Sequence, residues 1–68
     1  MSTRQATVAA YDEQTRDGRV LLDDGTGLAF PGAAVRPEVL RLRAGQRVDL
    51  ALEGGAVVAV TLAGMPLS

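Results

Sequence analysis

Short apolar runs separated by turn signals dominate this chain. Along its 68 residues, stretches with β-strand character are divided by polar segments rich in Gly and Asp. Turn signals at intervals of about 8–12 residues are typical of an all-β fold. One stretch, QRVDLALE at 46–53, alternates cleanly, with Val48, Leu50 and Leu52 on one face. The spacing therefore predicts a small all-β domain.

Turn chemistry divides this domain into five predicted strands. Asp-Gly within 23–27 is the strongest short signal for a hairpin, and Pro31 marks a strand end or an edge because it lacks a donor N–H. Pro37 suits the first position of a helix, so we expect a single helical turn over 37–42. The segment 63–68 is predicted to be a loose tail. The predicted strands are 6–12, 19–23, 28–32, 46–53 and 56–62.

Five strands in a chain this short cannot form a two-sheet sandwich of ordinary size. Closure into a small antiparallel Greek-key barrel removes exposed strand edges. We expect that barrel over about residues 5–62 of a single domain spanning 1–68. With one Phe and no Trp, the core is mostly aliphatic. The predicted core consists of Val8, Val20, Leu22, Leu28, Phe30, Val48, Leu50, Leu52, Val58, Val60 and Leu62.

Composition narrows the functional classes. The chain has no cysteine and no histidine, which excludes disulfides and thiolate sites and removes the commonest general base and a common zinc ligand. We therefore expect no enzyme, no metal and no cofactor. A net charge of −1 supplies no overall field for nucleic acid or membrane. No run resembles a signal peptide or reaches the roughly 18 apolar residues of a membrane span, so we expect a soluble cytoplasmic protein.

Several blocks resemble the cold-shock domain, an OB-fold barrel that binds single-stranded RNA and DNA. LRAGQRVDLALEGG at 42–55 is similar to the family's L-x-x-G-Q-x-V-x-F followed by an acidic, glycine-containing turn. TVAAYD and AVVAVT match the family's first and last strands. The resemblance covers about Ala6 to Leu62. It implies a five-stranded OB-fold that binds single-stranded nucleic acid, in gene regulation or RNA chaperoning.

The aromatic motifs with which that family stacks bases are degenerate here. Its pattern K-G-F-G-F-I falls on 15–20, where Asp17 and Arg19 replace the two phenylalanines. Its pattern V-F-V-H-F falls on 28–32, and none of the outward Phe, His and Phe is kept. Strand alternation places these changes on the open face and keeps the inward apolar set. Because stacking contributes about 1–3 kcal/mol per base, the resemblance implies weak binding.

Charge and the remaining aromatic side chain indicate candidate binding residues. Segment 12–24 holds five acidic residues against two arginines, a balance of −3 that would repel phosphates. Segment 36–47 holds four arginines against one Glu, which is either a patch for phosphates or an acidic partner, or a solvated loop offsetting the acidic segment. Arg19 and Tyr11 could stack bases, or they are a solvated and a packing residue. The candidates are Tyr11, Arg16, Arg19, Arg36, Arg41, Arg43 and Arg47.

A second interpretation assigns the open face to protein contacts or to self-association as a homodimer. In that case the surface consists of the apolar residues that stand where the family has aromatics. An enzyme is a third alternative, but its candidate acids, Asp23 and Asp24, adjoin a tight turn where acids are expected for turn geometry alone. The residues of the protein-contact surface would be Leu21, Ala29, Pro31 and Ala33.

Overall fold

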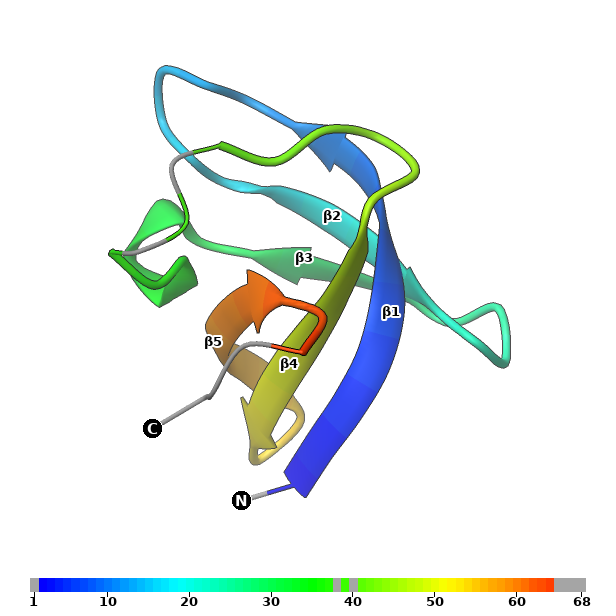
Figure 1. The fold of residues 1–68 in the computed structure, drawn as a ribbon. Helices are drawn as coiled ribbons and strands as arrows, with labels where there is room; N and C mark the ends of the chain where they lie inside the picture. Colours follow the sequence, from blue (N-terminus) through cyan, green and yellow to red (C-terminus); the bar gives the residue numbers. More distant parts are fainter. Residues whose placement is uncertain (1, 38, 40, 65–68) are drawn as a thin grey trace.

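Five antiparallel strands form one curled sheet, a half-barrel, in the computed structural model (Figure 1). The structure describes residues 2–37, 39 and 41–64. Within these residues no helix is long and apolar enough to cross a membrane. The elements are β1 (Ser2–Tyr11), β2 (Gly18–Leu22), β3 (Gly27–Phe30), the short 3-10 helix η1 (Gly32–Ala34), β4 (Arg47–Glu53) and β5 (Ala56–Leu62).

The all-β prediction is confirmed, and four strands lie within two residues of their predicted bounds. Strand β1 begins earlier, at Ser2, because its first residues pair with β4 although their side chains are exposed and carry no apolar pattern. Of the helical turn predicted over 37–42, residues 38 and 40 lie outside the described residues. The described helical element lies earlier, at η1. Residues 65–68 of the predicted tail also lie outside the described residues.

The long strand β1 bends the sheet by changing partners along its length. Its residues 2–7 pair with β4, and its residues 6–11 pair with β2 on the other edge. The register shifts between Val8 and Ala10, an irregularity of the kind that sharpens strand twist. The sheet order is therefore β3-β2-β1-β4-β5. The segment after η1 lies beside β5, where Val35 forms a parallel bridge with Val60.

The core lies inside the curl and agrees with the predicted set except at one position. Leu28, Leu52 and Leu62 are half-buried and pack against it, but Val58 is 43% exposed. Between β4 and β5 the register shifts, so that Leu52 lies opposite Val57 and Val58 has no partner. This extra residue reverses the alternation and turns Val57 into the core.

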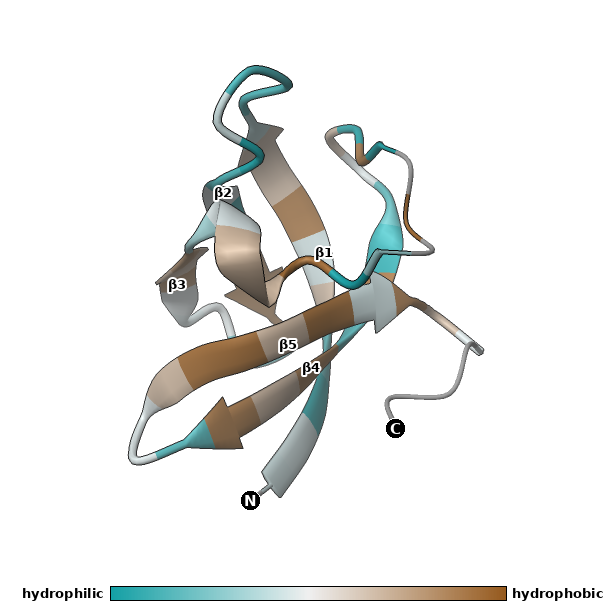
Figure 2. Cartoon of the chain, turned by 90° about the vertical axis from the view of Figure 1, so that its left-hand side faces the viewer, coloured by the Kyte–Doolittle hydropathy of each residue, from teal (hydrophilic) through white to brown (hydrophobic). Residues whose placement is uncertain are grey.

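Four further core residues come from the connection between β3 and β4, which includes η1. Ala34, Val35, Val39 and Leu42 are buried and fill the open side of the half-barrel. In Figure 2 the chain that leaves η1 becomes hydrophobic as it passes β5. Strand alternation could not reveal these positions, because a connection has no fixed period.

The register shift in β5 generates a matched pair of substitutions. Val57→Ala should lower the free energy of unfolding by about 2 kcal/mol, because it removes buried methyl groups. Val58→Ala should change it by less than about 0.5 kcal/mol, because the side chain is exposed. Urea denaturation of both variants measures the difference. Equal losses would contradict the observed register.

Candidate functional site

The connection between β1 and β2 is a tight turn held by Asp12. The Asp12 side chain accepts a hydrogen bond from the backbone N–H of Gln14 at 2.8 Å, and its carbonyl accepts one from Arg16 N–H at 2.7 Å. Arg16 has a φ of 66°, in the left-handed region that few residues other than glycine adopt. The turn therefore has a defined backbone that points the Arg16 side chain back toward the barrel.

The Arg16 guanidinium joins three segments of the chain. Its Nε donates to the Tyr11 hydroxyl at 3.3 Å, and its Nη2 donates to the Val39 carbonyl. The turn also packs against η1, since a side chain at Gly32 would overlap the carbonyl oxygen of Thr15. Arg16 therefore fixes the end of β1 against the β3–β4 connection.

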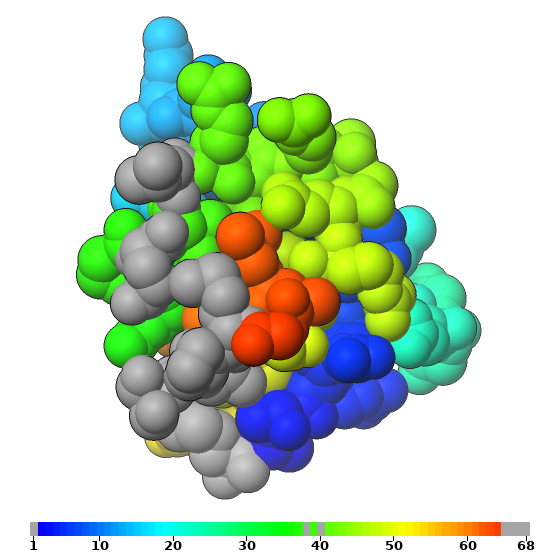
Figure 3. Space-filling model, viewed as in Figure 1, coloured from blue at the N-terminus to red at the C-terminus, as the bar shows by residue number. Residues whose placement is uncertain are grey.

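A groove of about 190 Å³ lies between the β1–β2 connection and the β3–β4 connection. Arg41 Nη1 is 4.0 Å from Glu13 Oε1 across it, and both side chains are about two-thirds exposed, at 68% and 66%. In Figure 3 the side chains of the two connections, light blue and green, project side by side from the top of the molecule. The groove thus combines an aromatic ring, two guanidinium groups and one carboxylate. Its lining residues are Tyr11, Glu13, Arg16 and Arg41.

A second hollow, an open cleft of about 450 Å³, lies on β2 and β3 around Arg19. Gly18 is required there, because a Cβ would overlap the Ala10 carbonyl oxygen and approach the Phe30 ring to 2.9 Å. The Arg19 guanidinium lies over Gly27, beside the Leu21 side chain. Among the described residues none forms an ion pair with Arg19. The cleft is lined by Asp17, Gly18, Arg19, Ala29, Phe30 and Pro31.

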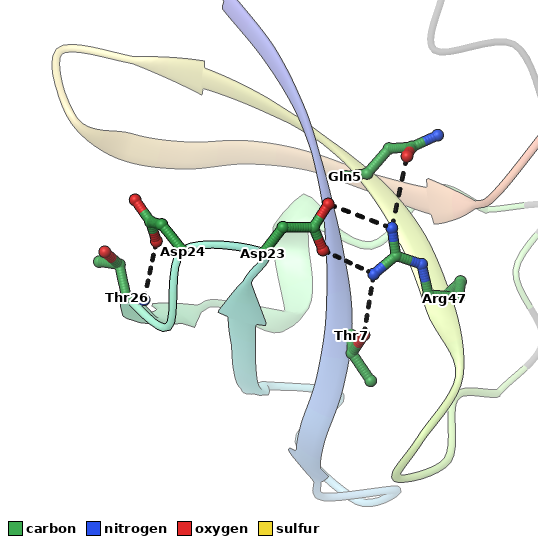
Figure 4. Close-up of polar contacts among 6 residues, drawn as sticks. All are labelled: Gln5, Thr7, Asp23, Asp24, Thr26 and Arg47. Carbon is green, nitrogen blue, oxygen red and sulfur yellow. Dashed lines mark hydrogen bonds and ion pairs between the residues drawn. The ribbon is translucent and has the colours of Figure 1, made fainter.

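Arg47 lies away from both hollows, in a network on the outside of the sheet (Figure 4). Its Nη1 is 2.8 Å from Asp23 Oδ1 and 3.1 Å from Thr7 Oγ1, and its Nη2 is 3.3 Å from Gln5 Oε1. The hydrogen bond and charge of Arg47 lower the pKa of Asp23, and the carboxylate raises the pKa of Arg47. This network ties the β2–β3 hairpin to β4 across β1.

The predicted binding residues therefore lie at several separate positions on the structure. Tyr11, Arg16 and Arg41 meet around one groove, where Tyr11 also packs against the core as the packing alternative expects, and Arg19 lines the neighbouring cleft. Arg36 is half-buried beside β5, where its backbone N–H donates to the Val60 carbonyl at 3.0 Å. The two remaining candidates line neither hollow: Arg43 is exposed on the β3–β4 connection, and Arg47 binds Asp23.

Several acidic side chains of segment 12–24 form ion pairs with arginines, two of them in segment 36–47. Arg41 offsets Glu13 and Arg47 offsets Asp23, as expected if the basic segment balances the acidic one. Asp24 is 3.9 Å from Arg4, and the Thr26 backbone N–H donates to it at 2.9 Å, which lowers the pKa of Asp24. The acidic segment is thus less repulsive to phosphates than its sequence indicates.

The chemistry of the groove suits a planar or anionic ligand more than a metal ion. Among the described residues, no three acidic side chains gather as metal ligands would. Sequence reasoning missed Glu13 as a lining residue, because nothing in a polar turn relates it to an arginine 28 positions later. No protein-family model matches this chain, and no curated protein shows significant similarity to it.

The Arg47 network predicts a pH-dependent contribution to stability. Asp23→Asn should lower the free energy of unfolding at neutral pH, because Arg47 loses its carboxylate partner. Since Arg47 lowers the pKa of Asp23 below the ordinary 3.8, this advantage is full above that pH and disappears as the pH falls through the lowered pKa. Urea denaturation of both proteins from about pH 7 to about pH 2.5 measures it. A difference that persists at the lowest pH would show that the charge is not its cause.

Proposed function

We propose that this chain is an OB-type Greek-key barrel that binds single-stranded nucleic acid weakly and has no catalytic activity. The sheet order, with β1 central and β3 and β5 at the two ends, is compatible with closure between those ends. The bridge between Val35 and Val60 supports closure at that seam by the connection that follows η1. The cold-shock resemblance of the sequence agrees with the same architecture.

The observation that carries this proposal is the groove shared by Tyr11, Arg16 and Arg41. These residues are up to 30 positions apart in the sequence, yet they surround one hollow. An aromatic ring beside guanidinium groups is the combination that proteins use for unpaired bases and their phosphates. The ring is held in place because Arg16 bonds its hydroxyl.

The Arg19 cleft extends this surface along the same hairpin. Arg16 lines the groove, and Asp17 and Gly18, the next residues in the chain, line the cleft. A strand that leaves the groove across Gly18 would meet the Arg19 guanidinium, whose plane can stack on a base. With two such positions and few free cations, we expect weak and salt-sensitive binding.

Substitutions of two exposed arginines with similar ion pairs test whether the groove binds nucleic acid. Arg41 and Arg4 each lie about 4 Å from one acid, but only Arg41 lines the groove. Arg41→Gln should weaken binding of labelled oligo(dT) or oligo(rU) several-fold and lower the dependence of log affinity on log salt by about 1. Arg4→Gln removes the same charge and should leave both values nearly unchanged. Fluorescence anisotropy at low salt measures them.

Equal effects of the two substitutions would mean that net charge, and not the groove, governs binding. No binding by the wild-type protein at about 50 μM and low salt would overturn the proposal, since even non-specific binders reach that range.

Self-association remains a second candidate because one face of the sheet carries exposed apolar side chains. Leu21 is 47% exposed on β2, and Ala29 and Pro31 are exposed on and beside β3. On the same face the charges of Arg47 and Asp23 pair with each other, whereas Arg19 has no ion pair among the described residues. Contacts between proteins favour surfaces of this kind.

If this face joins two copies, Leu21→Ser should shift the dimer toward monomer in sedimentation equilibrium. Val58→Ser is the matched control, because Val58 is similarly exposed, at 43%, but lies on β5. A wild-type protein that stays monomeric at high concentration would remove this candidate.

A further inference from the structure

Glu13 is the one groove residue that nucleic-acid binding in general does not explain. A carboxylate beside the path of a phosphate backbone repels it. Yet Glu13 lines the groove together with the ring of Tyr11 and the cation of Arg41. Its backbone follows Asp12, whose hydrogen bonds fix the turn, so the Glu13 side chain extends from a fixed backbone at the edge of the groove.

The Glu13 carboxylate is accessible to a ligand. Its 4.0 Å separation from Arg41 Nη1 is longer than a direct hydrogen bond, and about two-thirds of each side chain is exposed. A pair this open is weakly held in water. Glu13 can therefore accept hydrogen bonds from a ligand while Arg41 contacts an acceptor on that ligand or a phosphate.

Only one of the common bases matches this pair of groups. Guanine has two adjacent donors, N1–H and N2–H, on its pairing edge, and two acceptors, O6 and N7, on its major-groove edge. A carboxylate can accept from both donors at once, and an arginine can donate to both acceptors. Adenine and cytosine place an acceptor beside their donor, and thymine and uracil flank one N–H with two carbonyls. Each of those arrangements sets an acceptor against the carboxylate.

We propose that the groove selects guanine, with Tyr11 as the stacking surface, Glu13 as the acceptor for N1–H and N2–H, and Arg41 as the donor to the acceptor edge or the neighbouring phosphate. The selection rests on the proposed single-strand binding. It predicts a preference for guanine at one position of the bound strand. In the Arg19 cleft the Asp17 carboxylate already accepts a hydrogen bond from the Thr15 hydroxyl at 2.6 Å, so we expect no such preference there.

Three oligonucleotides of about eight residues test the selection. One is all thymidine, one has a central guanosine, and one has inosine there, which lacks the N2 amino group. The wild-type protein should bind the guanosine strand about tenfold more tightly than the thymidine strand, and inosine should lose much of that gain. Glu13→Gln should remove the preference and should bind the thymidine strand at least as tightly as the wild-type protein does, because it removes a charge that repels phosphates. The control Glu53→Gln, in the β4–β5 hairpin at the opposite end of the sheet in Figure 1, should keep it.

Each outcome separates the two proposals. Equal affinity of the wild-type protein for the three strands overturns the guanine selection and leaves single-strand binding in place. A guanosine preference that survives Glu13→Gln also overturns it, because the carboxylate is then not the acceptor. If no strand binds, the proposed function itself fails. Circular dichroism confirms that each variant is folded, which is expected because both glutamates are exposed.

Discussion

Strand β1 is paired to β4 through residues 2–7 and to β2 through residues 6–11, and the rest of the architecture depends on this exchange of partners. A strand with neighbours on opposite edges of its two halves must twist and coil, which curls the sheet around one small core. The same curl brings the end of β1 beside the β3–β4 connection. Tyr11 lies at that end, so the geometry of the groove follows from the pairing of the sheet.

Charge in this protein contributes to architecture as well as to the proposed recognition. Among the residues that the structure describes, Arg4, Arg41 and Arg47 each lie near an acid at least 20 positions away in the sequence. These exposed pairs are individually weak, but together they favour one placement of the hairpin and the connections. The proposed binding groove consists of a ring, two guanidinium groups and one carboxylate that shares its arginine.

The sequence predicts the strands well because alternation and turn chemistry are local properties. Val48 and Leu50, for example, are buried as their spacing predicts. The same rule fails at Val58, because an extra residue in β5 depends on the pairing with β4 and not on the order of residues within β5. The groove is less predictable still. Tyr11 and Arg41 can be named from their chemistry, but only the folded chain places them together and adds Glu13.

The bridge between Val35 and Val60 also limits strand pairing between copies of this chain. Strand β5 reads AVVAVTL, an uncharged, β-branched segment at the end of the sheet, and such an edge is a template for uncontrolled strand addition. Val35 occupies that edge at Val60, and the displaced Val58 interrupts the regular ladder closer to the hairpin. The β3–β4 connection, and not β5 itself, thus protects this edge. Loss of that connection's packing would expose an aggregation-prone edge while the five strands were still folded.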